Sequence, residues 1–248
     1  MDKKYAFILA SLILILILIN FLSITTFSVK EQNREKAVIS RIIDGDTLKL
    51  SDGRTIRLLN INAPEKGTHG ANLSAEFLRE FENKTVELEI TGTDKYKRTL
   101  ARIYAPEYLN LKLIEQGLAS KFLVEKSELS KFSKAEESAI KNSLGIWDKS
   151  PYFGCFDSKI DKVDEEVLII NNCAELDVNS WVLKDESRKT YTFKDISLGT
   201  ITLHSLKGEN NLTDLFWQNS GDVWNNDRDS LYLFDSTGRI AKYESYGY

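Results

Sequence analysis

The stretch Ile43-Asp-Gly-Asp-Thr-Leu-Lys-Leu50 contains an Asp-Gly pair, which supplies the backbone conformations that a short hairpin turn needs. A second pair, Asp52-Gly53, follows, and β-branched residues flank the two turns, as in Val38-Ile39 and Thr55-Ile56. Residues 37–104 are therefore predicted to be mainly strands joined by hairpins.

Three helices are expected beside these strands. One covers about 71–82, where apolar residues recur at helical spacing. The others cover 109–116 and 130–144, and each ends before a glycine. Strands followed by helices at one end indicate an α+β unit over 37–150, with a sheet that curls into a small barrel.

From residue 151 to residue 248 the sequence consists of short strand-like runs separated by polar turns. This spacing is typical of an all-β sandwich, so a second domain is predicted there. Its strands are expected at Val167–Ile170, Trp181–Leu183, Tyr191–Phe193, Ile201–Leu203 and Leu231–Phe234.

Composition excludes several classes of site. The chain has two histidines and two cysteines, too few for a site built on several imidazoles or for a four-thiolate zinc site. Residues 31–150 carry a net charge of +1, whereas residues 151–248 carry −7. Because nucleic acid is a polyanion, chemistry on phosphates belongs in the first of these segments.

The first 36 residues are predicted to form a single-pass transmembrane anchor and a linker. The 25 residues between Lys4 and Lys30 carry no charge, and a helix of that length crosses a bilayer. The apolar run from Ala6 to Leu22 is longer than the core of most signal peptides, and no A-x-A site follows it. Secretion after signal cleavage is the alternative.

Residues 31–248 are expected outside the cell. The apolar segment starts near the amino terminus, as export signals do, and an even number of cysteines suits an oxidising compartment. We expect a disulfide between Cys155 and Cys173, with two buried free thiols as the alternative. The protein is expected to be a monomer.

Polar residues cluster in the barrel segment at Asp44-Gly-Asp-Thr47, Arg57, Asn62-Ala-Pro-Glu65 and Asp94-Lys-Tyr-Lys-Arg98. Carboxylate and amide oxygens suit a hard cation such as calcium, and arginine binds phosphate through paired hydrogen bonds. A glutamate can orient or deprotonate water. Taken singly, these residues would be turns and a surface ion pair.

Taken together and in order, they resemble the staphylococcal nuclease (thermonuclease) family over about residues 37–150. The matching segments are Ile43–Leu50, Arg57–Glu65, Asp94–Arg98 with Ile103-Tyr104, Gln116–Ala119 and Gly145–Trp147. The resemblance implies an OB-type five-stranded β-barrel with helices, and calcium-dependent hydrolysis of DNA and RNA that leaves 3′-phosphates.

The resemblance also implies individual roles. The metal ligands would be Asp46, Asn62 and the carbonyl of Ala63, with Asn62 in the place of a usual aspartate. Loss of that negative charge should weaken calcium binding.

The remaining roles concern the substrate. Arg57 and Arg98 would grip the scissile phosphate, and Glu65 would act on the attacking water. Lys95 and Tyr96 would bind a terminal phosphate.

The C-terminal segment resembles the lamin-tail domain family, through Trp181–Asp185, Tyr191–Phe193, Val223–Asp227 and Leu231–Asp235. That resemblance implies an immunoglobulin-like sandwich that serves as a binding module or as a spacer between domains. It names no ligand. The leading hypothesis is thus a membrane-anchored extracellular nuclease. The alternatives are a catalytically weakened barrel that only binds nucleic acid or protein, and an adhesion or scaffold protein that works through the sandwich.

Overall fold

A computed structural model describes residue 15 and residues 34–174, 176–194 and 196–248. The chain divides into two compact units, residues 1–35 and residues 36–248. The segment predicted to cross a membrane lies outside the described residues, apart from residue 15. Within the described ranges, no helix has the length and apolar character that a membrane span requires.

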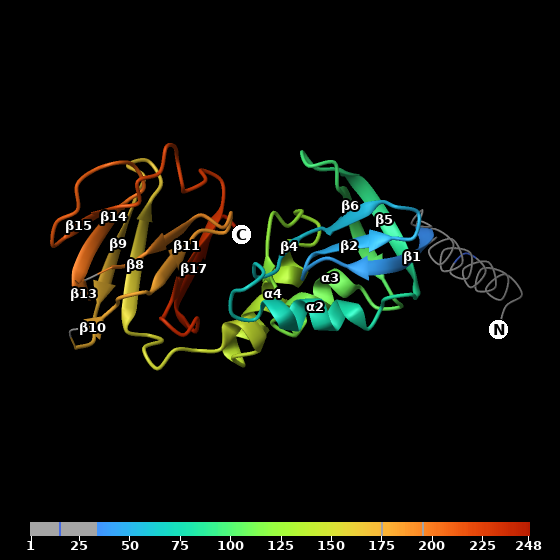
Figure 1. Cartoon of the computed structure of the whole chain (residues 1–248), viewed down its shortest axis with the longest axis horizontal. Helices are drawn as coiled ribbons and strands as arrows, with labels where there is room; N and C mark the ends of the chain where they lie inside the picture. Colours follow the sequence, from blue (N-terminus) through green and yellow to red (C-terminus); the bar gives the residue numbers. More distant parts are fainter. Residues whose placement is uncertain (1–14, 16–33, 175, 195) are drawn as a thin grey trace, which may run out of the picture. The chain divides into compact units, whose positions relative to one another are not determined.

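The first half of the larger unit is a closed barrel of five strands in the order β1-β2-β3-β6-β5, which confirms the predicted barrel (Figure 1). The pairs β1–β2, β2–β3 and β5–β6 are antiparallel, whereas β3 and β6 are parallel. The strands are β1 (Glu35–Ile42), β2 (Thr47–Leu50), β3 (Thr55–Leu58), β5 (Thr85–Thr93) and β6 (Thr99–Tyr104).

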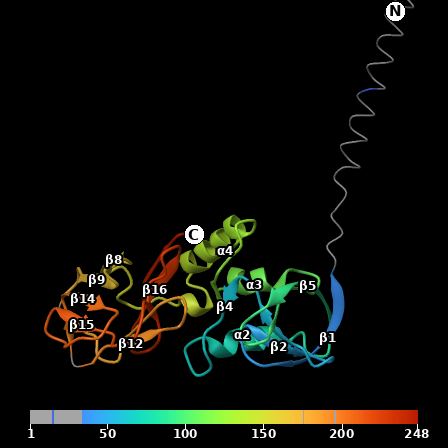
Figure 2. The ribbon, with the colours of Figure 1, turned by 90° about the horizontal axis from the view of Figure 1, so that it is seen from above.

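The three expected helices are present, each ending up to three residues earlier than predicted. Helices α3 and α4 pack against each other beside the barrel (Figures 1 and 2). Strands and helices share one apolar core, and each Leu, Ile or Phe buried in it contributes roughly 2 kcal/mol. The helices are α2 (Ala71–Arg79), α3 (Leu109–Glu115), α4 (Leu129–Lys141) and the 3-10 turn η1 (Gly145–Trp147), and a short ladder pairs β4 (Ile61–Asn62) with β7 (Ser120–Lys121).

Two four-stranded sheets follow, in the orders β12-β11-β16-β17 and β15-β14-β9-β8 (Figures 1 and 2). Trp181 and Trp224 are buried in the apolar core that the two sheets share. The strands are β8 (Phe156–Asp161), β9 (Glu166–Asn171), β11 (Val182–Lys184), β12 (Thr190–Thr192), β14 (Thr200–His204), β15 (Asp214–Phe216), β16 (Asp229–Phe234) and β17 (Ile240–Tyr246), with a small pair β10 (Leu176–Asp177) and β13 (Ser197–Leu198).

A disulfide joins the chain just before β8 to the chain just after β9. Its sulfurs, from Cys155 and Cys173, lie 2.06 Å apart. The two strands are already antiparallel neighbours, so the bond closes the open end of their hairpin. In the chain-entropy account, closing a loop of this size stabilises the fold by about 3 kcal/mol.

A third apolar cluster contains residues of both halves. Trp147 of η1 and Ala139 of α4 pack with Tyr232 and Ile240 of the sandwich. Barrel and sandwich are therefore joined by an apolar contact as well as by the polypeptide chain.

A buried polar network lies beside this cluster. Lys121 and Glu136 form an ion pair, with side chains 5% and 2% exposed. The hydroxyl of Tyr243, from the sandwich, lies 2.8 Å from Lys121 Nζ and 2.8 Å from Glu136 Oε2. Because a buried polar group costs free energy when it loses its partners, this network fixes how the two halves meet.

Candidate active site

The site is built around the turn that precedes β2. An added Cβ at Gly45 would lie 2.5 Å from Ser74 Cβ and 2.6 Å from Ala63 Cβ, so only glycine fits there. Asp44 Oδ1 accepts a hydrogen bond from the main-chain N–H of Asp46 at 3.0 Å. Burial, and then the charge of Asp46, raise the pKa of Asp44. The close packing of α2 and β4 on this turn therefore sets where Asp46 points.

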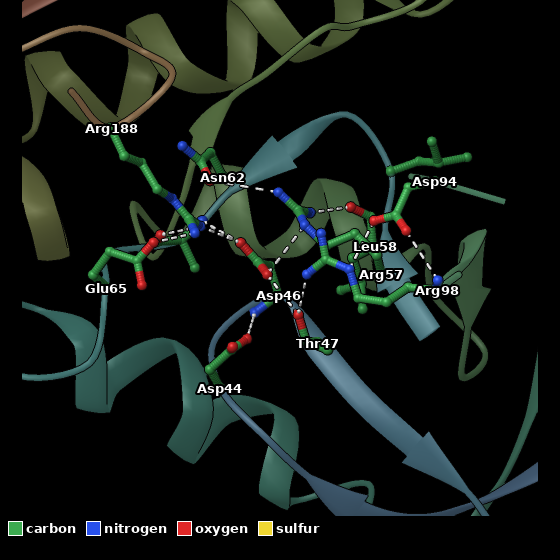
Figure 3. Close-up of polar contacts among 12 residues, drawn as sticks. Asp44, Asp46, Thr47, Arg57, Leu58, Asn62, Glu65, Asp94, Arg98 and Arg188 are labelled. Carbon is green, nitrogen blue, oxygen red and sulfur yellow. Dashed lines mark hydrogen bonds and ion pairs between the residues drawn. The ribbon is translucent and has the colours of Figure 1, made fainter. Parts of the chain in front are cut away.

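The carboxylate of Asp46 is buried and already oriented (Figure 3). Its Oδ1 accepts from Thr47 Oγ1 at 2.9 Å and lies 3.2 Å from Arg57 Nε. Its Oδ2 accepts from the N–H of Ala63 at 3.1 Å. These partners come from β2, β3 and the end of β4, so the barrel itself holds the carboxylate.

Arg57 lies on β3 directly opposite Thr47 of β2, which places its side chain at Asp46. The guanidinium donates to the carbonyl of Leu58 and, at 3.4 Å, to Asn62 Oδ1. Burial lowers the pKa of Arg57, as do its positively charged neighbours, whereas Asp46 raises it. Arginine nonetheless keeps its proton in proteins, so a fixed positive charge results.

Arg98 directly precedes β6, the return strand of the β5–β6 hairpin. Its Nε donates to Asp94 Oδ2 at 2.7 Å, and its Nη1 donates to Thr47 Oγ1 at 3.4 Å. Thr47 therefore links Arg98 to Asp46. The hairpin places Lys97 at a φ of +65°, a conformation that costs a side-chain-bearing residue roughly 1 kcal/mol.

The tip of this hairpin carries the two residues expected to bind a terminal phosphate. Tyr96 is 67% exposed. Lys95 Nζ lies 5.1 Å from the centroid of the Tyr96 ring, and the guanidinium carbon of Arg98 lies 5.4 Å from it. An exposed ring with cations beside it suits stacking on a base as well as phosphate binding.

A cavity of about 730 Å³ brings the predicted residues together. Asp46 and Ala63 do not line it but contact residues that do. The predicted site residues in its wall are Arg57, Asn62, Glu65, Lys95, Tyr96 and Arg98.

The cavity wall also contains a residue that sequence reasoning missed, Arg188, from the turn between β11 and β12. Its Nη1 donates to Glu65 Oε1, and its Nη2 lies 2.8 Å from Asp46 Oδ2 and 3.1 Å from the carbonyl oxygen of Ala63 (Figure 3). Arg188 is 142 residues from Asp46 and belongs to the other predicted domain. No motif around it signalled this placement.

The donor set around Asp46 fits a hard cation. Asp46 Oδ2 and the Ala63 carbonyl both contact one positively charged nitrogen, so two oxygens already converge on a cation. Asn62 adds an amide oxygen nearby, which here faces Arg57. Over the described ranges, no group of three His, Cys, Asp or Glu side chains could hold a metal. A cation here would depend on one carboxylate plus neutral oxygens.

Comparisons with known proteins agree with this geometry. The model of the family described as "Staphylococcal nuclease homologue" matches residues 55–149. The chain is 33% identical over 134 residues to an uncharacterized endonuclease of Haemophilus influenzae, covering 51% of this chain and 75% of that protein. It is 36% identical over 77 residues to an uncharacterized endonuclease of Escherichia coli O157:H7, covering 29% of this chain and 50% of that protein.

A third relative has a more specific name. Thermonuclease of Staphylococcus intermedius is 32% identical over 133 residues, covering 46% of this chain and 77% of that protein. The barrel, the cluster around Asp46 and these similarities agree, and the chain belongs to the staphylococcal nuclease family.

Proposed function

We propose that the chain is a calcium-dependent nuclease that hydrolyses phosphodiester bonds of DNA and RNA. One observation carries this proposal: two arginines and a glutamate line one cavity beside the buried carboxylate of Asp46. The named relatives are endonucleases and a thermonuclease. A protein that only bound nucleic acid would not need a glutamate at this place.

The arginines suit transition-state binding. Arg57 and Arg98 are anchored through Asp46 and Asp94, so their donors are in place before substrate arrives. Preorganised donors stabilise the charge that develops on the phosphate oxygens during hydrolysis. Arg98 retains an exposed edge, its side chain being 29% exposed, which leaves it accessible to a phosphate.

Glu65 suits work on water, since its side chain is 55% exposed beside the arginines. In the proposed reaction Glu65 accepts a proton from water as the water oxygen bonds to phosphorus. The bond from phosphorus to O5′ then breaks, O5′ takes a proton from solvent, and a 3′-phosphate remains.

Calcium would be held by Asp46, Asn62 and the carbonyl of Ala63. When bound, it would supply positive charge against the developing phosphate charge. Asn62 supplies an oxygen but no charge, so affinity below that of a site with a second carboxylate is expected.

Hydrolysis of single-stranded DNA and RNA by the full-length chain tests the proposal. We expect cleavage with calcium, none in excess chelator, and a loss of about a hundredfold or more in Arg98→Ala. Arg79→Ala, which removes an exposed arginine from α2, serves as the matched control. Undiminished cleavage in chelator would remove calcium from the proposal, and binding without cleavage would support the binding-module alternative.

The surroundings of the enzyme belong to the same proposal. We assign residues 1–36 to a membrane anchor, 37–150 to the nuclease domain and 151–248 to a lamin-tail-like sandwich outside the cell. The uncharged amino-terminal stretch and the disulfide support an exported protein. Protease added to intact cells should degrade the nuclease domain, whereas protection until lysis would contradict the location.

A further inference from the structure

Arg188 places a guanidinium among the oxygens that the proposed function assigns to calcium. One nitrogen, Nη2, contacts both Asp46 Oδ2 and the Ala63 carbonyl, at 2.8 and 3.1 Å. The other, Nη1, binds Glu65. The same side chain therefore covers proposed metal ligands and the proposed base.

The turn that carries Arg188 is fixed at its base. Asp185 Oδ1 accepts from the N–H of Lys189 at 2.7 Å, which closes the turn. The carbonyl of Glu186 accepts from Asn62 Nδ2 at 3.0 Å, and the N–H of Glu186 donates to Asp229 Oδ1 at 3.2 Å. The turn is thus held by the sandwich on one side and by the barrel on the other, and it points Arg188 into the site.

The contacts of Arg188 itself are partly exposed. Its side chain is 32% exposed and that of Glu65 is 55% exposed, whereas the Asp46 side chain is 3% exposed. The ion pair of Arg188 with Glu65 is open to water, which competes for both partners, so this contact contributes little. Arg188 can therefore leave at modest cost, while Arg57 remains beside Asp46.

Arg188 and a divalent cation cannot occupy the site together, because of steric overlap and like-charge repulsion. The guanidinium occupies the same two oxygens that the cation would need, and two positive groups in contact repel. With Arg188 in place, the charges of Asp46 and Glu65 are matched by those of Arg57 and Arg188.

We propose that Arg188 is a tethered cation that competes with calcium for Asp46 and Ala63 and holds Glu65 in an ion pair until it leaves. This inference rests on the proposed function, which makes those residues metal ligands and base. Calcium binding and withdrawal of the Arg188 side chain are then a single coupled event.

Calorimetric titration of the full-length chain with calcium alone tests the competition. Arg188→Gln and Arg188→Ala should each tighten calcium binding about tenfold, as expected if the open site is populated about one part in ten in the native protein. Lys194→Ala, which removes an exposed positive charge from the same domain, should not change it. Native-like melting curves of both Arg188 variants confirm folding, and unchanged affinity in both would overturn the proposal.

A fourth variant separates this inference from the proposed function. Asp46→Asn should abolish calcium binding. If it binds calcium as the native chain does, the proposed metal site is wrong. If Asp46→Asn loses calcium binding but the Arg188 variants bind calcium no more tightly than the native chain, the proposed metal site stands and only the competition by Arg188 is wrong. In nuclease assays the Arg188 variants should reach half-maximal activity at about tenfold lower calcium.

Discussion

The barrel and the sandwich each direct an arginine at the carboxylate of Asp46, and the two are held very differently. Arg57 is 8% exposed and contacts partners within eleven residues along the chain. Arg188 is 32% exposed along its side chain, comes from a turn, and binds partners more than 120 residues away.

The difference separates a part of the machinery from a regulator of it. A buried arginine on a strand cannot leave without removing the partner that compensates the buried charge of Asp46. An arginine on a turn can leave when a stronger cation arrives. The barrel therefore supplies the arginine that stays in the site, Arg57, and the sandwich supplies the arginine that can leave it, Arg188.

The largest effect is expected at Arg102, whose substitution tests how strongly a buried arginine stabilises the barrel. Arg102 lies on β6, 8% exposed, and forms ion pairs with Glu89, Glu125 and Glu128. Burial lowers its pKa, but the hydrogen bond and charge of Glu128 outweigh that effect and raise it. Arg102→Leu should lower the free energy of unfolding by about 3 kcal/mol, because it leaves three acids together. Denaturant titration measures this, and a loss below 1 kcal/mol would mean that water already screens the network.

Arg57 tests catalysis. Arg57→Ala should reduce turnover by about a hundredfold or more, and Arg57→Lys should also lose most activity because lysine lacks the paired donors. Arg188→Ala at saturating calcium should not lose activity. Steady-state kinetics, with circular dichroism as the folding control, give the comparison. Equal losses at both positions would erase the distinction between them.

Asn62 contacts both the barrel and the sandwich, since its side chain binds Arg57 and the carbonyl of Glu186. Asn62→Asp adds a negative charge to the proposed cation site and removes the donor to Glu186. Both effects should tighten calcium binding, by about tenfold. Calorimetric titration measures the affinity, and a weaker or equal affinity would place residue 62 outside the cation site.

Asp185 gives the smallest effect, on the sandwich side. Burial and the charge of Asp229 raise the pKa of Asp185 to about 6. The unfolded carboxyl titrates near 4, so between these values the native state binds more protons and stability falls as pH rises. Asp185→Asn should therefore raise the melting temperature by about 3 °C at pH 8 and scarcely at pH 4. Asp164→Asn, at an exposed carboxyl, is the control, and an equal rise at both pH values would contradict the charge argument.

Local patterns predicted the fold well. The Asp52-Gly53 turn, where Gly53 has a φ of +94°, and the helical spacing within 71–82 report conformations that neighbouring residues decide, and the helices were placed to within three residues at each end. Short strands such as β4 and β7 were not predicted individually, because two-residue ladders exist only through their tertiary pairing. Closure of the barrel also needs the parallel pairing of β3 with β6, which is not a hairpin, and the five-stranded barrel was expected from the family resemblance.

The candidate site divides along the same line. Residues on adjacent strands, such as Asp46 and Arg57, could be placed together because hairpin register brings them opposite each other. Arg188 could not, because its position depends on how the sandwich packs on the barrel through Trp147, Tyr232 and the Lys121–Glu136 pair. Nothing periodic in the sequence encodes such a contact.

Trp147 has a practical consequence for anyone who shortens the chain. Trp147 is 1% exposed, and its packing partners Tyr232 and Ile240 belong to the sandwich. A fragment that stops at residue 150 would present the Trp147 indole and the neighbouring face of α4 to water, and uncovered apolar patches of this kind promote aggregation. Low soluble yield or low activity of such a fragment would then result from the missing sandwich and would not be evidence about catalysis.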